Sequence, residues 1–519
     1  MSELKAGVII NYASIVISLS TSFFLTPFVI EKLGMEEYGL FMLSGSVISW
    51  LALSDMGLGA TVRKYVTAFR ARHEENEQKA FLGQATLLFS VIALITLVVG
   101  VGCFFYLDAF FPDLTPAQHS TLQVLYLLTL GNMIVAFPLR PLACLPGCYL
   151  KYIIPGIIGL SSSILGAGLT VLLLLCGYKA IGLSVLGVVM GVLGLIAGLI
   201  YTIGVLGVRL RFGKPNWRLY REMFQFSFWV LLNQIMDMFY WRAGTPIVAR
   251  LSGAGAVSLF TLGTSFSSYF MTASTAISGV LGTKVMQMVA ADADGERLTD
   301  TMIRAGRMQL TILCIIMLGF LVLGHDFLTL WVGKSIGDGV TTVWLGALLV
   351  LLPLFIPLTQ NVGLSLLQAM NIHRGRAIIL FYSSLVCVIM GYVLTTIWGP
   401  IGMFIGTGVS LVFGQCIMIN LYYHRRAGLN IPRFFRETYG PAILPASLLL
   451  LAGWGWAQIW SVQDWTDFFV AAGVYGILCA IALFVFYLTR SERSLFTDPI
   501  VSFYQSIVQK VRHKHDKSL

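Results

Sequence analysis

The sequence predicts an all-α polytopic membrane protein with about 14 transmembrane helices. We expect two six-helix lobes in a parallel pseudo-repeat, followed by two C-terminal helices. Hydrophobic residues make up 57% of the 519 residues and charged residues only 11%, and the mean hydropathy is +0.83. Soluble domains carry about 25% charged residues. Composition, an internal repeat and the placement of basic residues together support this fold class.

Each helix is predicted where the chain has an apolar run of about 20 residues, the length that crosses a hydrocarbon core. Six runs precede the basic segment near residues 207–222, six follow it, and two come last. The expected domains are an N-terminal lobe (1–210), a second lobe (211–425), a two-helix hairpin (426–490) and a basic cytoplasmic tail (491–519). The predicted helices lie near 8–30, 38–61, 82–107, 120–142, 153–176, 180–206, 223–250, 254–280, 306–330, 341–367, 377–398, 401–423, 440–460 and 468–489.

An internal repeat relates the junction between the first two helices to a second junction 219 positions later. Without any gap, eight pairs of residues are identical. Pro27 and Gly34 in the first copy match Pro246 and Gly253 in the second, and in both copies Pro and Gly end one helix and turn the chain. The repeat indicates a duplicated lobe. Because each lobe has an even number of helices, both should enter the membrane in the same direction. The first copy contains Thr26, Pro27, Val29, Gly34, Leu40, Phe41, Leu43 and Ser46; the second contains Thr245, Pro246, Val248, Gly253, Leu259, Phe260, Leu262 and Ser265.

Basic residues are distributed unequally between the two sides of these helices. With the N-terminus placed in the cytoplasm, only Lys32, Lys179 and Lys334 fall in outward loops, and Arg242 and Arg250 fall within spans. The other Lys and Arg residues, of 34 in total, lie on the cytoplasmic side. This asymmetry satisfies the positive-inside rule, so both termini are predicted to be cytoplasmic. It also explains the net charge of +10 without a nucleic-acid partner.

The seventh predicted helix holds the acidic residue that lies nearest the middle of the membrane. Asn233, Gln234 and Asp237 share one polar face, because positions four apart are neighbours on a helix, and Arg242 follows. Charged groups deep in a membrane are expensive and are usually functional. We therefore interpret Asp237, with Asn233 and Gln234, as an H⁺ or Na⁺ coupling site and Arg242 as an anion contact. The alternative is an Asp that only pairs with another helix.

Other polar residues within the spans allow two interpretations. Asn11, Gln360 and Asn361 could line a polar cavity, and bonding between helices explains them equally well. For Asp55, at a Gly-rich turn, a structural hydrogen bond is favoured. The sequence has no HExxH, GxSxG, P-loop or zinc-ligand spacing. We expect no catalytic residue, no metal and no cofactor apart from a coupling ion.

The opening of the chain resembles a known family. Asn11, Pro27, Leu33-Gly34, Tyr38-Gly39-Leu40 and Asp55-Met-Gly-Leu-Gly59, which precede Arg63, resemble the start of polysaccharide-transporter flippases. These belong to the multidrug/oligosaccharidyl-lipid/polysaccharide (MOP) exporter superfamily, and the likeness is to the bacterial Wzx-type flippases of O-antigen and exopolysaccharide. The motif covers about the first 65 residues, whereas the helix layout and the repeat extend over the chain.

The resemblance implies the MOP flippase fold and alternating access around a central cationic cavity. It implies a bacterial inner-membrane protein that moves an undecaprenyl-diphosphate-linked oligosaccharide to the outer leaflet, driven by H⁺ or Na⁺. Arg242, Arg63 and Arg250 are the expected diphosphate contacts, since fixed positive charge replaces the solvation of a phosphate. Asp237 resembles the acidic group of the seventh helix that binds a cation in related flippases. Membrane lipids and polysaccharide assembly proteins are the expected partners.

Three other functions are compatible with a polytopic membrane protein. A drug or cation antiporter of the same superfamily should have 12 helices and carboxylates in its cavity, so the additional pair of helices favours the flippase. A membrane polysaccharide polymerase or ligase should carry a long outward loop with paired basic or acidic residues. A scaffold without transport activity would not need Asp237 and Arg242 inside the membrane.

Overall fold

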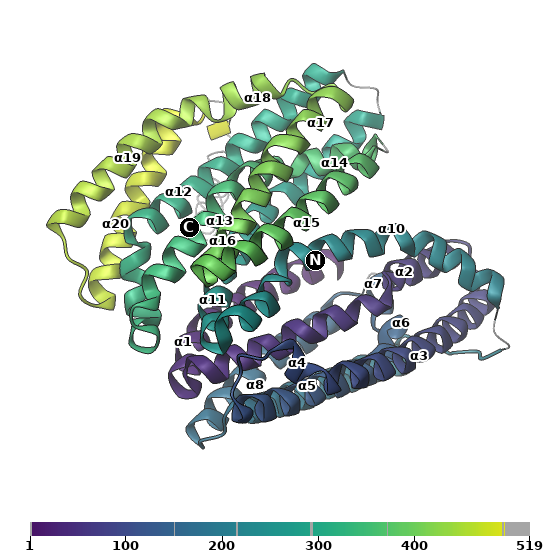
Figure 1. Ribbon diagram of the computed structural model, residues 1–519. Helices are drawn as coiled ribbons and strands as arrows, with labels where there is room; N and C mark the ends of the chain where they lie inside the picture. The colour runs from purple at the N-terminus through teal and green to yellow at the C-terminus, as the bar shows by residue number, and fades with distance from the viewer. Residues whose placement is uncertain are drawn as a thin grey trace, which may run out of the picture. The chain divides into compact units, whose positions relative to one another are not determined.

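The computed structural model is helical throughout the part of the chain that it describes (Figure 1). The described residues are 3–149, 151–213, 216–290, 294–370, 372–489 and 492–493, so the predicted tail at 491–519 lies almost wholly outside them. Among these described residues, 12 helices are long and apolar enough to cross a membrane. The predicted fold class, an all-α polytopic membrane protein, is confirmed. The number 14 stays a prediction, because two of the 12 long elements each contain a backbone break.

The elements follow one another with short connections. Up to the first π-helix they are α1 (Glu3–Leu51), η1 (Ala52–Asp55), α2 (Leu58–Ala71), α3 (Glu75–Phe105), α4 (Leu107–Phe110), α5 (Pro116–Ala136), η2 (Phe137–Leu139), α6 (Arg140–Ala143), α7 (Leu145–Cys148), α8 (Ile153–Leu175), α9 (Ala180–Ile200) and η3 (Tyr201–Val205). The later elements are α10 (Trp217–Trp241), α11 (Gly244–Ala290), α12 (Gly295–Ile336), α13 (Gly339–Thr359), α14 (Asn361–Ala369), α15 (His373–Trp398), α16 (Pro400–Leu411), η4 (Val412–Met418), α17 (Ile419–Arg426), α18 (Ile431–Thr438), α19 (Gly440–Ile459), α20 (Trp465–Ala482) and η5 (Leu483–Tyr487).

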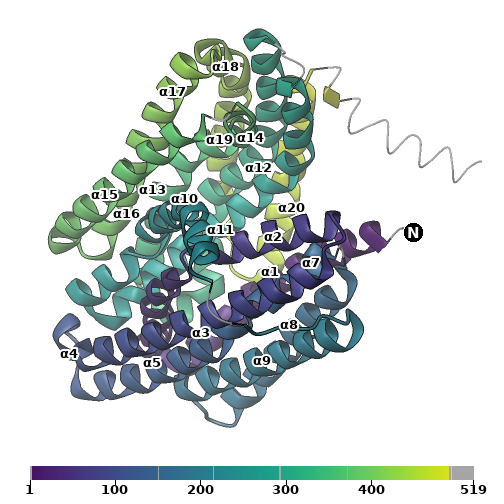
Figure 2. The same cartoon turned by 90° about the vertical axis from the view of Figure 1, so that its right-hand side faces the viewer.

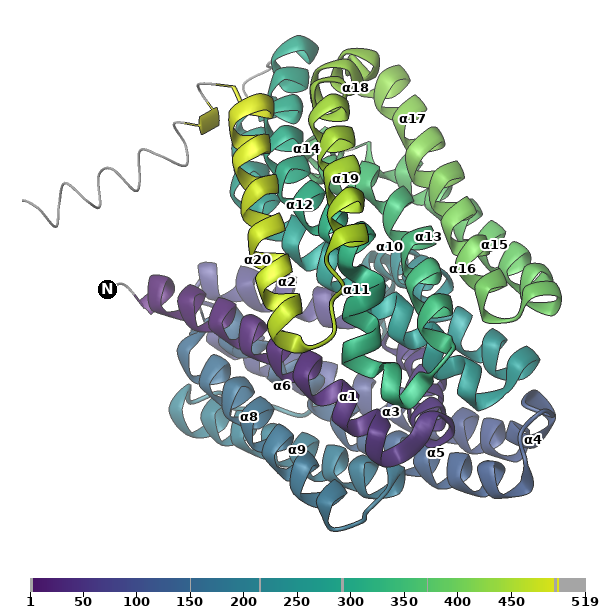
Figure 3. The same cartoon turned by 90° about the vertical axis from the view of Figure 1, so that its left-hand side faces the viewer.

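The chain forms two compact units. The first contains Met1–Ser265, Trp331–Ala347 and Leu380–Ser410, and the second contains Phe266–Leu330, Leu348–Ile379 and Leu411–Leu519. The division runs through α11, α12, α13 and α15 rather than between helices. In the first unit, α1 packs against α5 and α8, and α8 and α9 lie side by side (Figures 2 and 3).

The two breaks occur at equivalent positions of the internal repeat. Gly34 interrupts α1 with φ 78° and ψ 166°, and Gly253 interrupts α11 with φ 77° and ψ 178°. This backbone conformation is essentially restricted to glycine. An added Cβ would meet no atom within 4 Å at either position, so backbone conformation rather than space explains the glycine. The repeat seen in the sequence is therefore also a repeat of backbone geometry.

The two junctions contact each other inside the first unit. A Cβ at Gly39 would lie 1.9 Å from the carbonyl oxygen of Ala254, so only a glycine allows this approach. The hydroxyl of Ser258, which is buried, donates to the carbonyl of Met35. The backbone just after one break thus packs on the backbone just after the other.

In the described part of the second unit, two apolar clusters include residues of α12. In one, Met302 packs with Leu366 of α14, Tyr423 of α17 and Phe434 of α18. In the other, α12 contributes Leu310, Cys314 and Leu318, and α19 and α20 pack against it (Figure 3). The C-terminal pair of helices is thereby attached to α12 along an apolar face.

A buried ion pair fixes the end of this C-terminal pair. The Nε of Arg307 in α12 lies 3.0 Å from one carboxylate oxygen of Glu492, and their side chains are only 8% and 4% exposed. The guanidinium also donates to the carbonyls of Glu437 and Tyr487 and lies 4.4 Å from the centre of the Tyr487 ring. A buried charge needs such partners, because removing an ion from water costs several kcal/mol or more. The attraction between the two ions offsets about as much as this desolvation costs.

The break in α1 leads to the first prediction. Gly34→Ala should destabilise the protein by about 1–3 kcal/mol, because alanine does not readily adopt this backbone conformation. Gly45→Ala is the matched control: it lies in the same helix, with helical geometry and open space around its Cβ. Alanine there should be neutral or stabilising by up to about 1 kcal/mol. Thermal unfolding of the purified variants in detergent measures the difference, and equal midpoints for the two variants would contradict the assignment.

Candidate transport site

The polar residues predicted on the seventh helix lie on one continuous helix, α10. Asn233, Gln234 and Asp237 all precede its last residue, Trp241. Asn233 and Asp237 are exposed on the surface of the first unit, and Gln234 is half-buried. The Oε1 atom of Gln234 is buried and accepts no hydrogen bond from the described residues. A buried acceptor without a partner, three residues before a carboxylate on a membrane helix, is a suitable place for a cation or a proton donor.

Two neighbouring helices hold the first half of α10. Asn216 caps the helix by accepting the N–H of Leu219 at 3.2 Å. The phenol of Tyr220 donates to Oε1 of Gln84 in α3 at 2.8 Å, and burial raises its pKa. Further along, the hydroxyls of Ser227 and of Thr61 in α2 are 2.6 Å apart. These bonds fix the register in which α10 presents its polar face.

Arg242 lies at an interruption between α10 and α11, not inside a helix. The predicted helix 223–250 is wrong at this point, because α10 ends at Trp241 and α11 begins at Gly244. The cause is Pro246, which has no N–H to donate to the carbonyl four residues earlier, that of Arg242. Ser46 of α1 donates its hydroxyl to that carbonyl instead, at 3.1 Å.

The first copy of the repeat frees the corresponding carbonyl, although α1 continues through Pro27 without an interruption there. Pro27 lies four residues after Phe23 and leaves the carbonyl of Phe23 without a helical donor. The indole N–H of Trp331 donates to this carbonyl at 3.0 Å, and the two rings stack with centroids 5.2 Å apart. Arg242 and Phe23 are therefore equivalent positions whose freed carbonyls each have one buried donor.

Tyr240, three residues after Asp237 on α10, belongs to a group of hydroxyls from three helices. The Oγ of Ser410 in α16 donates to the carbonyl of Ser383 in α15 at 2.5 Å. The phenol oxygen of Tyr240 lies 3.0 Å from the same Oγ and 3.3 Å from the carbonyl of Ser410. The Oγ of Ser383 is buried and has no partner among the described residues. The structure thus brings together a polar cluster from three helices. The sequence did not predict it, because single serines far apart in the chain form no recognisable motif.

The other predicted arginines have different surroundings. Arg63 is exposed on α2, and Arg250 is exposed on α11. Arg250 donates to the carbonyl of Phe110 at the end of α4, at 3.0 Å. Asp55 accepts the N–H of Gly57 and the guanidinium of Arg140, each at 2.6 Å. These contacts give Arg250 and Asp55 a structural function, whatever else they bind.

Gln360 and Asn361 lie in the second unit, at the break between α13 and α14. The amide of Asn361 donates to the Oγ of Ser274 at 3.0 Å, and Gln309 donates to the same Oγ at 3.3 Å. The amide of Gln360 donates to Asn420 at 2.7 Å. Hydrogen bonds between helices therefore engage the amide NH₂ groups of both predicted residues, whereas the buried Oε1 of Gln360 has no partner among the described residues. The side chain of Asn11, which was also predicted to line a cavity, lies outside the described residues.

The comparisons with known proteins agree with the resemblance seen in the sequence. Residues 149–338 match the family model described as polysaccharide biosynthesis protein. The uncharacterized membrane protein EpsK of Bacillus subtilis (strain 168) is 21% identical over 500 residues, which cover 93% of this chain and 95% of that protein. The resemblance of the sequence to polysaccharide biosynthesis proteins is confirmed.

Solved structures with the same fold are membrane transporters. The lipid II flippase MurJ, in an inward closed conformation, superposes with a TM-score of 0.70 at 14% identity, over 95% of this chain and 99% of that chain. A multidrug resistance MATE family transporter of the MOP superfamily, in an inward-facing conformation, gives 0.61 at 11% identity, over 83% of this chain and 99% of that chain. These likenesses show the MOP fold.

The freed carbonyl of Arg242 leads to the second prediction. Ser46→Ala should destabilise the protein by about 0.5–1.5 kcal/mol, because it removes the hydrogen bond to a carbonyl that Pro246 leaves without a helical donor. Ser265→Ala is the matched control at the equivalent position of the repeat, where the hydroxyl donates only to Thr261 within its own helix, at 2.7 Å. Thermal unfolding of both variants checks this prediction. An equal loss of stability in the two variants would show that the bond from Ser46 to Arg242 contributes no more than an ordinary hydrogen bond within a helix.

Proposed function

We propose that the protein is a flippase for an undecaprenyl-diphosphate-linked oligosaccharide, the repeat unit of a lipopolysaccharide O-antigen or of an exopolysaccharide. It moves this lipid from the inner to the outer leaflet by alternating access. The observation that carries the proposal is the interruption between α10 and α11, with Asp237 one turn before it and Arg242 at it. Interrupted membrane helices are where transporters of several folds bind substrates and ions. The match to a polysaccharide biosynthesis family and the fold of a lipid II flippase support it.

Ion coupling is proposed at Asp237, with Asn233 and Gln234 beside it. A carboxylate within a membrane helix is a functional site by default, and H⁺ or Na⁺ is the coupling ion that it would bind. The phenol of Tyr240, three residues after Asp237 on α10, bonds with the hydroxyl of Ser410 on α16, so neutral oxygens gather on the same part of α10 and support this proposal. No other cofactor is proposed.

Substrate contact is proposed first at Arg242. Its backbone is held by Ser46, so the guanidinium extends from a fixed point. A diphosphate that leaves water needs charge-assisted hydrogen bonds, and arginine supplies them in a forked geometry. Arg63 and Arg250 are further candidates for the diphosphate, and Asn11, Gln360 and Asn361 for the sugar.

The location and partners follow from the charge asymmetry and the family match. We place the protein in the cytoplasmic (inner) membrane of a bacterium, with both termini in the cytoplasm. Its lobes would be 1–210 and 211–425, with the hairpin 426–490 outside the repeat. Besides the lipid-linked oligosaccharide and membrane lipids, polysaccharide assembly proteins are proposed as partners.

The third prediction tests transport and coupling together. Purified protein in proteoliposomes should move a fluorescent polyprenyl-diphosphate oligosaccharide across the bilayer, faster with a pH or Na⁺ gradient of the correct sign. Asp237→Asn should remove the gradient dependence, because an amide cannot be ionised, and should leave the protein folded. The control is Glu222→Gln on the same helix, which should keep the gradient dependence. The carboxylate of Glu222 is half-exposed and pairs with Arg218. Unchanged gradient dependence in Asp237→Asn would exclude the coupling site.

The fourth prediction concerns the diphosphate contact. Arg242→Ala should weaken binding of a polyprenyl diphosphate by about tenfold or more, the size expected for a lost hydrogen bond to a charged group. Binding of the corresponding neutral polyprenol should not change. Arg218→Ala, on the exposed first turn of α10, is the control. Equal losses for the charged and the neutral lipid would assign Arg242 to packing.

A drug or cation antiporter is the second candidate, supported by the fold of the MATE family transporter. That likeness covers less of this chain than the lipid flippase does, which favours the first candidate. The proteoliposome assay separates the two: export of a cationic dye, without movement of any lipid-linked glycan, would establish the antiporter. A membrane glycan polymerase or ligase would instead lengthen or transfer the glycan in the same assay.

A further inference from the structure

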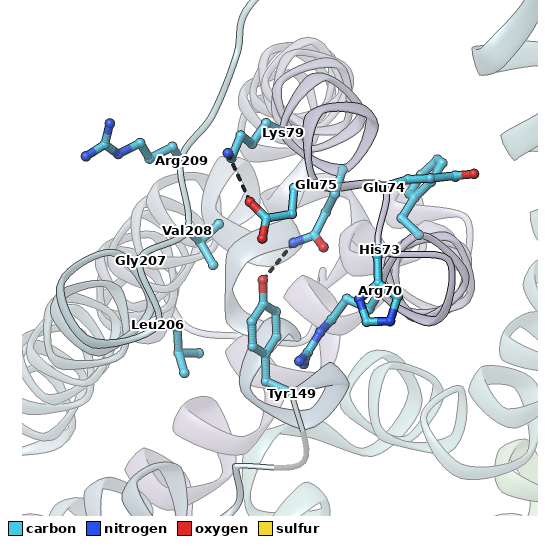
Figure 4. Close-up of a pocket in the computed structure, with 12 residues that line it drawn as sticks. Arg70, His73, Glu74, Glu75, Lys79, Tyr149, Leu206, Gly207, Val208 and Arg209 are labelled. Atoms are coloured by element: carbon cyan, nitrogen blue, oxygen red, sulfur yellow. Dashed lines mark hydrogen bonds and ion pairs between the residues drawn. The ribbon is translucent and has the colours of Figure 1, made fainter.

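A polar pocket lies at one end of the first unit, away from the interruption between α10 and α11. Its volume is about 370 Å³, and it is formed by the end of α2, the start of α3, the residue after α7 and the segment after η3 (Figure 4). This size lies within the range of small-molecule sites. Arg70, His73, Lys79 and Arg209 contribute basic groups to its lining.

The arrangement of Arg70, Tyr149 and Gln78 leaves hydrogen-bond donors in the pocket lining available for a ligand. The guanidinium of Arg70 stacks 3.6 Å from the centre of the Tyr149 ring, and its NH1 donates to the carbonyl of Cys148 at 3.1 Å. Gln78, which is buried, donates to the phenol oxygen of Tyr149 at 2.8 Å. Because this oxygen accepts from Gln78, its own proton remains available to donate. Arg70 is likewise only partly used, since a guanidinium has five N–H groups.

The acidic residues of the lining do not cancel this charge. Glu75 lies 3.4 Å from the Nζ of Lys79, so these two form a neutral pair. In Figure 4 the carboxylate of Glu74 points away from Tyr149, and Arg70 lies close beside the tyrosine ring. Next to the phenol the pocket therefore has a net positive charge, which complements a single phosphodiester.

An apolar pocket of about 390 Å³ adjoins the polar one. It lies among α6, α7, α8 and α9, and Gly159, Gly194 and Gly198 keep it open. Both α8 and α9 are membrane spans and have the two smallest buried fractions of the 12 candidates in the described chain, so much of their surface faces lipid.

Two backbone hydrogen bonds join the walls of the two pockets. The N–H of Tyr149, in the polar pocket, donates at 3.2 Å to the carbonyl of Pro146, in the apolar pocket. The N–H of Val208 donates in the same way to the carbonyl of Thr202, at 3.3 Å. A polar, positively charged site thus borders an apolar site at the end of two membrane helices.

We propose that these pockets bind one anionic phospholipid of the surrounding membrane. The phosphodiester lies against Arg70 and the hydroxyl of Tyr149, near Lys79, and an acyl chain enters the apolar pocket beside Gly194. Basic pockets between membrane helices are typical binding sites for anionic lipid headgroups. The site is separate from the transport site and does not depend on the identity of the transported glycan.

The test measures lipid retention by the purified full-length protein in native mass spectrometry and the thermal shift on adding lipid. Phosphatidylglycerol should bind at least about fivefold more tightly than phosphatidylcholine, the gain expected for one basic side chain at a headgroup. Lys79→Gln and Tyr149→Phe should each reduce that preference. The matched control is Arg72→Gln, which should leave that preference unchanged. Arg72 is also at the end of α2 but is not part of the pocket lining.

A second pair of variants tests the acyl chain. Gly194→Leu fills the apolar pocket, where the nearest atom to a new Cβ is the Oγ of Ser162 at 4.0 Å. It should lower phosphatidylglycerol retention several-fold and leave binding of soluble glycerol phosphate unchanged. Gly187→Leu, on the same helix with open space around its Cβ and outside the pocket lining, is the control and should retain lipid.

Three outcomes would overturn the proposal. Equal retention of the two phospholipids would exclude an anionic site. Tight binding of glycerol phosphate alone, unaffected by Gly194→Leu and without lipid retention, would make the pocket a site for a soluble anion. Displacement of phosphatidylglycerol by stoichiometric polyprenyl diphosphate would assign the pocket to the transported lipid.

Discussion

A proline inside a helix leaves one backbone carbonyl without its usual N–H donor. The need to supply another donor to that carbonyl is the constraint on which the first unit depends. Such a carbonyl needs a donor from elsewhere, because an unpaired buried carbonyl costs about 1–3 kcal/mol. Pro27 and Pro246 create this requirement at equivalent places, and Trp331 and Ser46 meet it from other helices. These bonds attach each interrupted segment to a helix that is distant in sequence. The glycine breaks that follow allow the two junctions to touch through their backbones.

Much of the fold was predictable from the sequence, because burial in lipid imposes a simple rule on composition. Apolar runs of membrane length place the helices, and the spacing of Pro27 and Gly34 against Pro246 and Gly253 reveals the repeat. The same spacing holds the information that α10 ends before Pro246. A count of hydrophobic residues does not reveal this helix end, because an apolar run across a proline looks continuous.

The candidate site was less predictable, because its partners come from other helices. Asp237 and Arg242 stand out as charges in an apolar sequence. Nothing in the sequence distinguishes Ser46, Ser383 or Ser410 from other small residues of membrane helices, since their function depends on which carbonyl they face. The pair of Arg307 with Glu492 is hidden for the same reason: the two are far apart in the chain, and each looks like a loop charge.

The equivalence of Phe23 and Arg242 explains how one half of a duplicated protein can acquire a charge without losing its architecture. At both positions the main chain makes the bond that fixes the interrupted helix. The side chain has no part in that bond, so it can diverge between the copies. One copy has an aromatic ring that stacks on Trp331, and the other has a guanidinium. A backbone that is held independently of its side chain is thus a site where new chemistry can evolve at little cost to folding.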